Sequence, residues 1–371
     1  MKTIKLLVLS VIFLMTFFGT AFAKSTVIIV RDHRVFNEDG TVNQQVLNNM
    51  LDEGIKTFYG VDNAPAGWQQ AFGPQDRVAI KVNALDAYFA PLYTTYKGIT
   101  HPELAAAISE GLISAGVKPK NIVIFDRKQL GINNKEVVDV MKLGRYADYV
   151  PKGVQVVAGG KYMPAVTLSN GAKLNFLSEL YWCTKLINAP VLKAHPAMGL
   201  TFALKNNFGS FKPAEMKAID GATQYASAYP LHANGGIPGF QALNSYPLIK
   251  DKTTLIIGDA LRAQYRAHYY DPKGSWAYDA IIIGSDPVAV DRTAWNILAK
   301  KRKEEGINYY ISQPLDLWRL DNKKQKAAVT MTPHHMARGG VAGAYIQDCA
   351  KAGLGTDDVD NIDLKIIDLD S

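Results

Sequence analysis

The 371-residue chain has only two cysteines and lacks the short signatures of several common enzyme classes. Two thiols cannot hold a four-cysteine iron–sulfur cluster or a cysteine-rich zinc site within one chain. The sequence contains no glycine-rich dinucleotide motif, no P-loop, no Gly-x-Ser-x-Gly elbow and no His-Glu-x-x-His motif. Dinucleotide chemistry, P-loop hydrolysis, serine hydrolysis and a structural metal are therefore disfavoured.

Long apolar runs are also scarce, and beyond the N-terminus no segment is long enough to span a bilayer. Residues 1–23 combine Lys2 and Lys5 with an apolar stretch and a small-residue site that ends at Ala23. This pattern is typical of a secretory signal. We expect cleavage after Ala23 and a periplasmic or secreted protein without a stable membrane anchor; an uncleaved anchor is the alternative.

The net charge is mildly basic, with 41 Lys and Arg against 34 Asp and Glu. Both signs are mixed along the chain, and the basic runs at residues 300–303 and 323–326 are typical of solvated faces. We expect no nucleic-acid partner, and a protein partner remains open.

The two cysteines, Cys183 and Cys349, both fall in the exported part of the chain. A disulfide is permitted in that compartment. Two separate buried thiols are the equally ranked alternative.

Short apolar runs alternate with amphipathic segments, which indicates an α/β fold with a mostly parallel sheet and flanking helices in Rossmann-like layers. Residues 24–371 form either one domain or two interlocked subdomains. A turn at 169–172 predicts a small β-hairpin insertion over 165–176. The expected main strands cover residues 26–30, 77–82, 121–125, 186–192, 253–257 and 278–283.

Capping patterns place the expected helices. Thr100 and Glu103 make a capping box for a helix that ends near Gly116. Asp286 caps a helix that begins at Pro287 and runs to about residue 301. Further helices are expected over 43–59 and from about 334 to 352.

Polar residues follow five of the predicted strands, where ligands bind in open α/β sheets. The alternative for each pair is an ordinary turn or cap residue. The pairs are Asp32 and His33, Asn83 and Asp86, Asp126 and Arg127, Lys193 and His195, and Asp259 and Arg262.

The densest segment holds Lys193, His195 and Lys205, which we identify as candidate catalytic residues. The lysines either hold an anion as charged donors or, once desolvated, act as base or nucleophile. Lys205 is otherwise a surface lysine lying along the helix. His195 suits acid/base chemistry or metal ligation.

Amide and carboxylate side chains around these residues are candidate cofactor-binding groups. Asn206 and Asn207 either orient a ligand or end the helix before Gly209. His232 and His268 could join Asp259 in a mixed nitrogen and oxygen metal site, although no metal is identified. The candidate binding set is Asn83, Asp126, Asn206, Asn207 and Asp259.

The order of these motifs resembles the domain of unknown function 362 family over about residues 77–295. Some members carry a cysteine-rich ferredoxin-like segment, which this chain lacks, so the resemblance does not imply iron–sulfur electron transfer here. The motifs are Lys81–Asn83, Thr100–Glu103, Ile124–Asp126, Asn188–His195, Leu204–Gly209, Ile257–Ala260 and Gly284–Asp291.

The segment with Lys193, His195 and Lys205 is also distantly similar to the nickel-pincer lactate racemase family. In that family a lysine anchors the cofactor and histidines transfer protons. This chain lacks the family's run of closely spaced glycines in that segment.

Three functions follow as hypotheses. The first is binding of a small anionic ligand or organic cofactor, with or without acid/base catalysis. The second is a non-catalytic binding or assembly protein that contacts a partner through the same site or through the aromatic segment 225–246, because interfaces favour aromatics. The third is a metal-dependent isomerase or hydrolase built on His195, His232 and Asp259.

Overall fold

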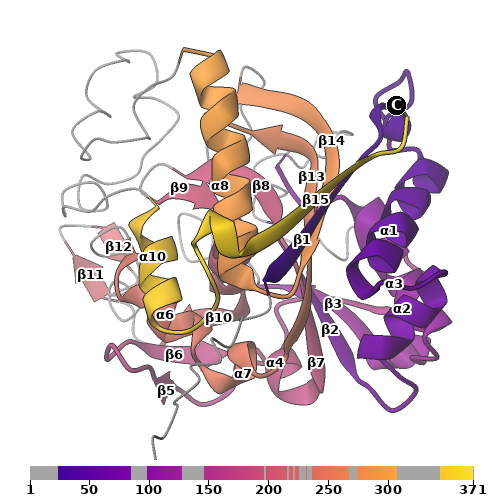
Figure 1. Ribbon diagram of the computed structural model, residues 1–371. Helices are drawn as coiled ribbons and strands as arrows, with labels where there is room; N and C mark the ends of the chain where they lie inside the picture. The colour runs from indigo at the N-terminus through magenta and orange to yellow at the C-terminus, as the bar shows by residue number, and fades with distance from the viewer. Residues whose placement is uncertain are drawn as a thin grey trace, which may run out of the picture.

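The computed structural model describes residues 24–84, 98–127, 146–195, 198–214, 217–219, 222–224, 231, 236–266, 274–306 and 343–370 (Figure 1). The predicted signal segment therefore lies outside the described residues. In the described part, no helix is both long and apolar enough to cross a membrane.

A ten-stranded sheet organises the molecule, with the order β15-β1-β14-β13-β7-β2-β3-β4; β8 also pairs with β13, and β9 pairs with β8. Every neighbouring pair on the main path is parallel except the two that involve β14. The predicted α/β fold with a mostly parallel sheet is thus confirmed. The strands are β1 (Ser25–Arg31), β2 (Val78–Val82), β3 (Ile122–Asp126), β4 (Gln155–Ala158), β7 (Lys185–Ala189), β8 (Val191–His195), β9 (Gly199–Thr201), β13 (Thr253–Gln264), β14 (Ser275–Gly284) and β15 (Ile362–Asp368).

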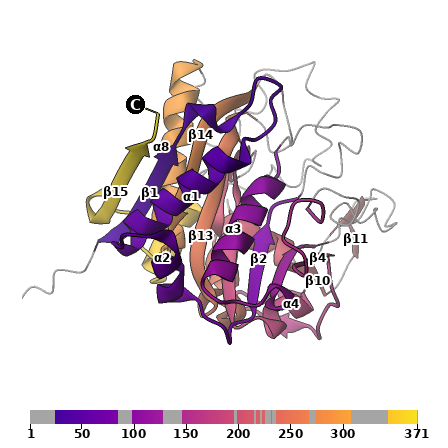
Figure 2. The same cartoon turned by 90° about the vertical axis from the view of Figure 1, so that its right-hand side faces the viewer.

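Helices cover both faces of this sheet (Figures 1 and 2). Successive residues of β1 point to opposite faces of the sheet. Ile28 and Val30 pack with α1 and α3, whereas Val27 and Ile29 pack in the core that includes α8. Burial on both faces explains the nearly continuous apolar runs of these strands. The helices of the two layers are α1 (Gln44–Tyr59), α2 (Ala64–Ala71), α3 (Pro102–Ser114), α8 (Pro287–Glu304) and α10 (Ala344–Lys351).

The smaller elements include the predicted hairpin, which is confirmed as β5 (Val166–Thr167) paired antiparallel with β6 (Lys173–Phe176). Strand β10 (Phe211–Pro213) extends it to a three-stranded sheet. The remaining short elements are η1 (His33–Val35), η3 (Pro119–Asn121), α4 (Ser178–Trp182), α5 (Ala203–Asn206), η5 (Asn207–Ser210), β11 (Lys217–Ile219), β12 (Ala222–Gln224), α6 (Gly239–Asn244), α7 (Pro247–Lys250) and η11 (Val359–Asn361).

The apolar run predicted as one strand over 186–192 is two strands separated by Pro190. Strand β7 pairs with β2 and β13, and β8 then pairs further along β13, which runs to Gln264. Lys193 and His195 therefore lie within β8, and Asp259 and Arg262 lie within β13. The prediction that these four residues follow strand ends was wrong, because β13 continues past the parallel core to pair with β8 and β14.

Two caps illustrate how local sequence places the helices. Asp286 accepts hydrogen bonds from the N–H groups of Val288 and Ala289 and starts α8 as predicted. The N-cap of α3, however, is His101, not the predicted Thr100, and it makes no side-chain capping bond. The Thr100 hydroxyl is used instead in a tertiary contact described below.

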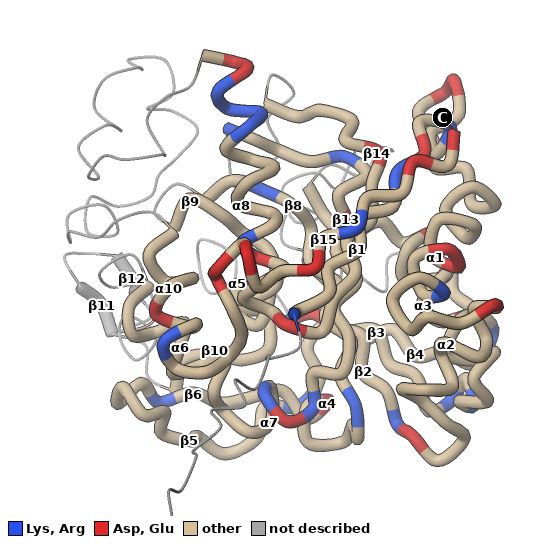
Figure 3. The backbone as a smooth tube through the Cα atoms, viewed as in Figure 1, with Lys and Arg blue, Asp and Glu red and all other residues tan. Residues whose placement is uncertain are grey.

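Three further expectations need correction. Arg302, in the basic run expected to be solvated, is buried and donates to the carbonyls of Tyr265 and Gly199. Its neighbours Lys300 and Lys303 are exposed, and Figure 3 shows the blue basic run near the end of α8. The late helix predicted from about 334 to 352 is not continuous, because α10 begins at Ala344 after Gly343 in the left-handed region at φ 80°; residues 334–342 lie outside the described residues. Strand β15 was not predicted. The run at 323–326 lies outside the described residues.

Both cysteines are free and buried in this structure. Cys183 packs at the end of α4, and burial raises the pKa of its thiol to about 11. Burial also raises the pKa of the Cys349 thiol in α10. The arrangement corresponds to the second of the two alternatives, separate buried thiols.

Candidate functional site

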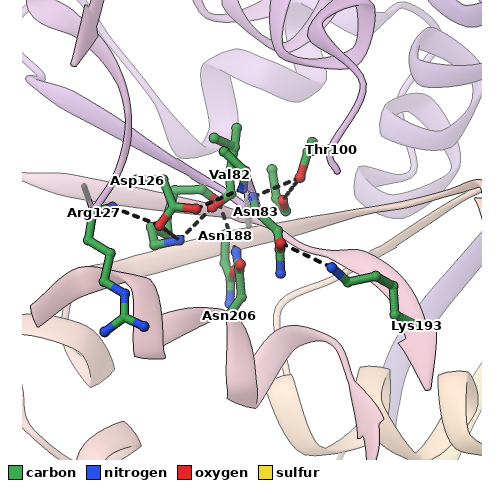
Figure 4. Close-up of polar contacts among 11 residues, drawn as sticks. Val82, Asn83, Thr100, Asp126, Arg127, Asn188, Lys193 and Asn206 are labelled. Atoms are coloured by element: carbon green, nitrogen blue, oxygen red, sulfur yellow. Dashed lines mark hydrogen bonds and ion pairs between the residues drawn. The ribbon is translucent and has the colours of Figure 1, made fainter. Parts of the chain in front are cut away.

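The ends of β2 and β3 hold a buried ion pair (Figure 4). The Lys81 ammonium lies 2.9 Å from Asp126 Oδ1, and both side chains are at least nine-tenths buried. Asp126 also accepts the backbone N–H groups of Ala84 at 2.7 Å and Arg127 at 2.8 Å. Burial lowers the pKa of Lys81, and the carboxylate of Asp126 opposes that shift. The positive charge of Lys81 is therefore matched within the protein.

Gly209 closes over this pair. A Cβ atom at this position would lie 2.1 Å from Asp126 Oδ1 and 2.5 Å from Lys81 Nζ. Its carbonyl also accepts the N–H of Arg127 at 3.0 Å. Close packing therefore requires glycine at this position. Gly209 does not end the helix as predicted, because Asn207 to Ser210 continue as the 3-10 turn η5.

Asn83, which directly follows β2, lies beside Lys193 of β8 (Figure 4). The Lys193 ammonium donates to the Gly98 carbonyl at 2.8 Å and to Asn83 Oδ1 at 3.4 Å. The Thr100 hydroxyl accepts the Asn83 N–H and donates to the Ala189 carbonyl at 2.7 Å. The chain around Asn83 is thus fixed beside Lys193.

The amide side chains of Asn206 and Asn207 bind the α5 segment to the sheet and to α6. Asn206 donates to the Lys81 carbonyl and to Asn188 Oδ1 at 2.7 Å. Asn207 donates to Asn244 Oδ1 at 2.8 Å. The Oδ1 atoms of Asn206 and Asn207 are buried and have no hydrogen-bond partner among the described residues. Buried acceptors of this kind are uncommon in proteins and are free to bind a donor from water or a ligand.

Lys205 is buried, which excludes the surface-lysine interpretation. Within the described part of the chain it makes no hydrogen bond or ion pair; its ammonium lies 4.5 Å from the centre of the Phe208 ring. Burial lowers its pKa to about 7, and the positive charges of Arg127 and Lys193 act in the same direction. Close to neutral pH the amine therefore exists in both protonation states.

Asp291 positions the segment that carries Lys205. Its buried carboxylate accepts the N–H groups of Ala203 at 2.7 Å and Leu204 at 3.3 Å, at the start of α5. Burial raises its pKa to about 8 despite these bonds. This contact joins residues 88 positions apart, and the sequence analysis did not predict it.

Asp259 lies beside His101, a residue not predicted as functional. Asp259 Oδ2 accepts the His101 N–H at 2.6 Å and lies 2.7 Å from its Nδ1, with both side chains buried. Burial lowers the pKa of His101, but the Asp259 carboxylate outweighs it and the net shift is upward. Asp259 is the one aspartate in the mostly apolar run that forms β13, and this was the sequence signal that it has a buried partner.

His195 ends β8, where its Nδ1 accepts the Met198 N–H at 3.1 Å and the side chain is buried.

Among the candidates, Asn83, Lys193, Asp126 and Asn206 join one network through Lys81 and the strand ends. His195, Asn207 and Asp259 have partners of their own. Lys81 was overlooked as a site residue although it interrupts an otherwise apolar strand, which is the sequence signal for a buried charge.

The remaining candidates do not gather here. Asp32 binds Arg34 at 2.7 Å, and His33 lies 2.9 Å from Asp279. No cluster of three or more His, Cys, Asp or Glu in the described residues could hold a metal ion. Asp86, His232 and His268 lie outside those residues.

Two aromatic side chains of the segment 225–246, which was proposed as an interface, pack against other aromatic rings of the protein. Phe240 is fully buried and stacks on Tyr345 with ring centres 4.2 Å apart. Tyr246 stacks on Phe176 at 5.1 Å. Phe240 therefore belongs to the core, whereas Tyr225 and Tyr229 lie outside the described residues.

A family model described as domain of unknown function (DUF362) matches residues 78–296, which is more than half of the chain. The chain belongs to this family. The match includes the elements that carry Lys81, Asp126, Lys193, Lys205 and Asp259, so the site described above lies within the family domain. A search of curated proteins found no match.

Among solved structures, the chain is similar to the lactate racemase apoprotein from Thermoanaerobacterium thermosaccharolyticum, with 16% identity over 73% of this chain and a TM-score of 0.39. It is also similar to a protein from Thermotoga maritima, with 11% identity over 68% of this chain and a TM-score of 0.34. The aligned part spans 56% of the first protein and 60% of the second.

Proposed function

We propose that this DUF362 protein binds a small anionic ligand, or an anionic organic cofactor, at Lys205, Lys193 and Arg127. The observation that carries the proposal is the ammonium of Lys205, which is buried without a carboxylate partner among the described residues. A buried charge is costly unless it is paired. A carboxylate or phosphate from a ligand would supply the missing negative charge.

The surrounding groups support binding of an anion rather than a cation. Lys193 and Arg127 both lower the pKa of Lys205 through their positive charge. The carboxylate of the network described above, Asp126, is already occupied by Lys81 and by two backbone N–H groups. Among the described residues, the ammonium of Lys205 is thus left for a ligand to neutralise.

We also propose that Lys205 and His195 carry out acid/base catalysis on the bound molecule. A lysine whose pKa is about 7 can serve as base or nucleophile, because its neutral amine is present near neutral pH. The buried His101–Asp259 pair and the amides of Asn83, Asn206 and Asn207 would orient the bound molecule.

The test is isothermal titration of the mature protein with sodium phosphate, acetate and oxalate, at ionic strength matched with sodium chloride. Lys205→Gln keeps a polar side chain but removes the charge. We expect it to weaken binding of the tightest anion by about 10–100-fold, the value of one charge-assisted hydrogen bond. Lys193→Gln is expected to weaken it as well.

The matched control is Lys212→Gln, because Lys212 is an exposed lysine only a few positions away that lies over the Tyr162 ring. Binding of the control is expected to equal that of the wild type. The proposal is wrong if no anion binds the wild type, or if Lys205→Gln and Lys212→Gln bind the same anion with the same affinity.

A further inference from the structure

Strand β15 forms one edge of the large sheet. It pairs in parallel with β1 from Ser25 opposite Ile362 to Arg31 opposite Asp368. In the described part of the chain no strand pairs with its outer side. Figure 2 shows β15 as the last strand of the sheet, with β1 and the helices all on one side of it. Within the described part of the chain, its outer backbone groups therefore have no strand partner and can pair with another strand.

The apolar side chains of β15 are unusually exposed. Leu364 is 45% exposed and Ile366 is 53% exposed. They lie opposite Val27 and Ile29 of β1, which are buried in the core that includes α8. The apolar face of the sheet thus continues outward through β15 and ends in solvent.

The other edge of the sheet is different. Strand β4 has only four residues, and the first of these, Gln155, is polar and exposed. Short, polar edge strands resist pairing with other chains. Strand β15 has seven residues and an apolar face, so it has less of this protection.

The sequence of β15 is complementary to itself in one antiparallel register. With Leu364 opposite Leu364 of a second copy, Ile362 lies opposite Ile366, and Asp363 lies opposite Lys365. The Ile362–Ile366 contact and the Asp363–Lys365 pair then each occur twice, and the Leu364–Leu364 contact lies on the two-fold axis, as two-fold symmetry requires.

Registers shifted by one residue in the strand are unfavourable. Centring the pairing on Lys365 would put two ammonium groups opposite one another, and centring it on Asp363 would do the same with two carboxylates. Within the protomer Asp363 and Lys365 lie 3.7 Å apart and are about half exposed, so both are available to a partner. Asp368, beyond the paired segment, is already held by Arg31 at 2.6 Å.

We propose that the protein forms a two-fold symmetric dimer in which the β15 strands of two copies pair antiparallel about Leu364. The two sheets would join into one continuous sheet, and Leu364 and Ile366 would be covered at the junction. The partner is a second copy of this chain, because the strand matches its own pattern of charge and apolar residues.

Charge reversal tests this register. In the full mature protein, Asp363→Lys places two ammonium groups opposite one another at each of the two symmetric contacts, and Lys365→Asp places two carboxylates opposite one another. We expect each single variant to weaken dimerisation by at least about tenfold, because like charges directly opposite are destabilising where opposite charges were favourable. The double variant Asp363→Lys/Lys365→Asp restores both pairs and is expected to return within a few-fold of the wild type.

Sedimentation equilibrium over a range of micromolar concentrations gives the dissociation constants, and circular dichroism checks that each variant is folded. Lys351→Asp on α10 is the control for charge reversal at an exposed lysine elsewhere. A monomeric wild type would overturn the proposal. So would single variants that dimerise as tightly as the wild type, or a double variant that stays as weak as the singles.

Discussion

Lys81 and Lys205 are both buried lysines in neighbouring parts of the DUF362 domain, but their surroundings differ in charge. Lys81 has the carboxylate of Asp126 at 2.9 Å and the Val82 carbonyl as a second acceptor. Lys205 has an aromatic ring and two neighbouring cations. Desolvation acts on both, yet among the described residues only Lys81 has a carboxylate partner.

The difference separates a structural charge from one that is available to a ligand. A paired buried lysine contributes to the placement of β2 and β3, and its removal leaves the partner carboxylate without a counter-charge. An unpaired buried lysine gives the folded state nothing in return for its desolvation. Proteins keep such destabilising groups mostly at functional sites, where a ligand or a reaction uses them.

The largest effect expected is the loss of the Lys81 counter-charge. Asp126→Asn leaves a buried ammonium without its carboxylate, and we expect the free energy of unfolding to fall by about 3–5 kcal/mol. Glu53→Gln removes a partly exposed pair with Lys56, for which about 0–1 kcal/mol is expected. Urea denaturation of both variants decides the comparison: equal losses would show that the buried pair is not what stabilises this end of the sheet.

Adding a methyl group beside the same ion pair is expected to lower the free energy of unfolding by a smaller amount. Gly209→Ala places a methyl group against Asp126 and Lys81, so the pair must separate or η5 must move. We expect a loss of about 1–3 kcal/mol in the free energy of unfolding, as in other overpacked sites.

Gly73→Ala is the matched control, because a Cβ atom there would meet no atom within 4 Å. If the two alanine variants unfold at the same urea concentration, then the tight contact around Gly209 is not a constraint on this site.

Local sequence patterns were sufficient to predict much of the fold. Alternating apolar runs predicted the parallel sheet, Asp286 before Pro287 predicted the start of α8, and the turn at 169–172 predicted the hairpin. Each of these features is decided within a few residues. Strand β15 was missed because its exposed, interrupted apolar pattern has no buried run to mark it.

The pairing of site residues could not be predicted in the same way. The bond from Asp291 to Ala203 and the contact of His101 with Asp259 join residues 88 and 158 positions apart. Pro190 shifts β8 along β13, and this shift moved Lys193 from an expected strand end into a strand interior. A single sequence identifies buried charges by the apolar residues around them, but only the tertiary structure identifies which charges are paired.

The smallest effect expected in stability has the opposite sign from the first two. Lys205→Met removes a buried charge that lacks a partner, so we expect the variant to be more stable than the wild type by about 0.5–2 kcal/mol at slightly acid pH. The lysine is protonated in the unfolded state up to its ordinary pKa of 10.5, whereas in the folded state it loses its proton above about 7. Between these values the unfolded state binds more protons, so the stability of the wild type rises with pH.

The advantage of Lys205→Met should therefore be full below about pH 7 and shrink by up to about 1.4 kcal/mol for each pH unit above it. Urea denaturation of both proteins on either side of that pH measures the change, with Lys212→Met as the control for loss of an exposed lysine. An advantage that stays constant with pH would mean that the Lys205 amine is not desolvated in the folded protein. A loss of stability at acid pH would mean that the protein already neutralises its charge, and the contrast with Lys81 would disappear.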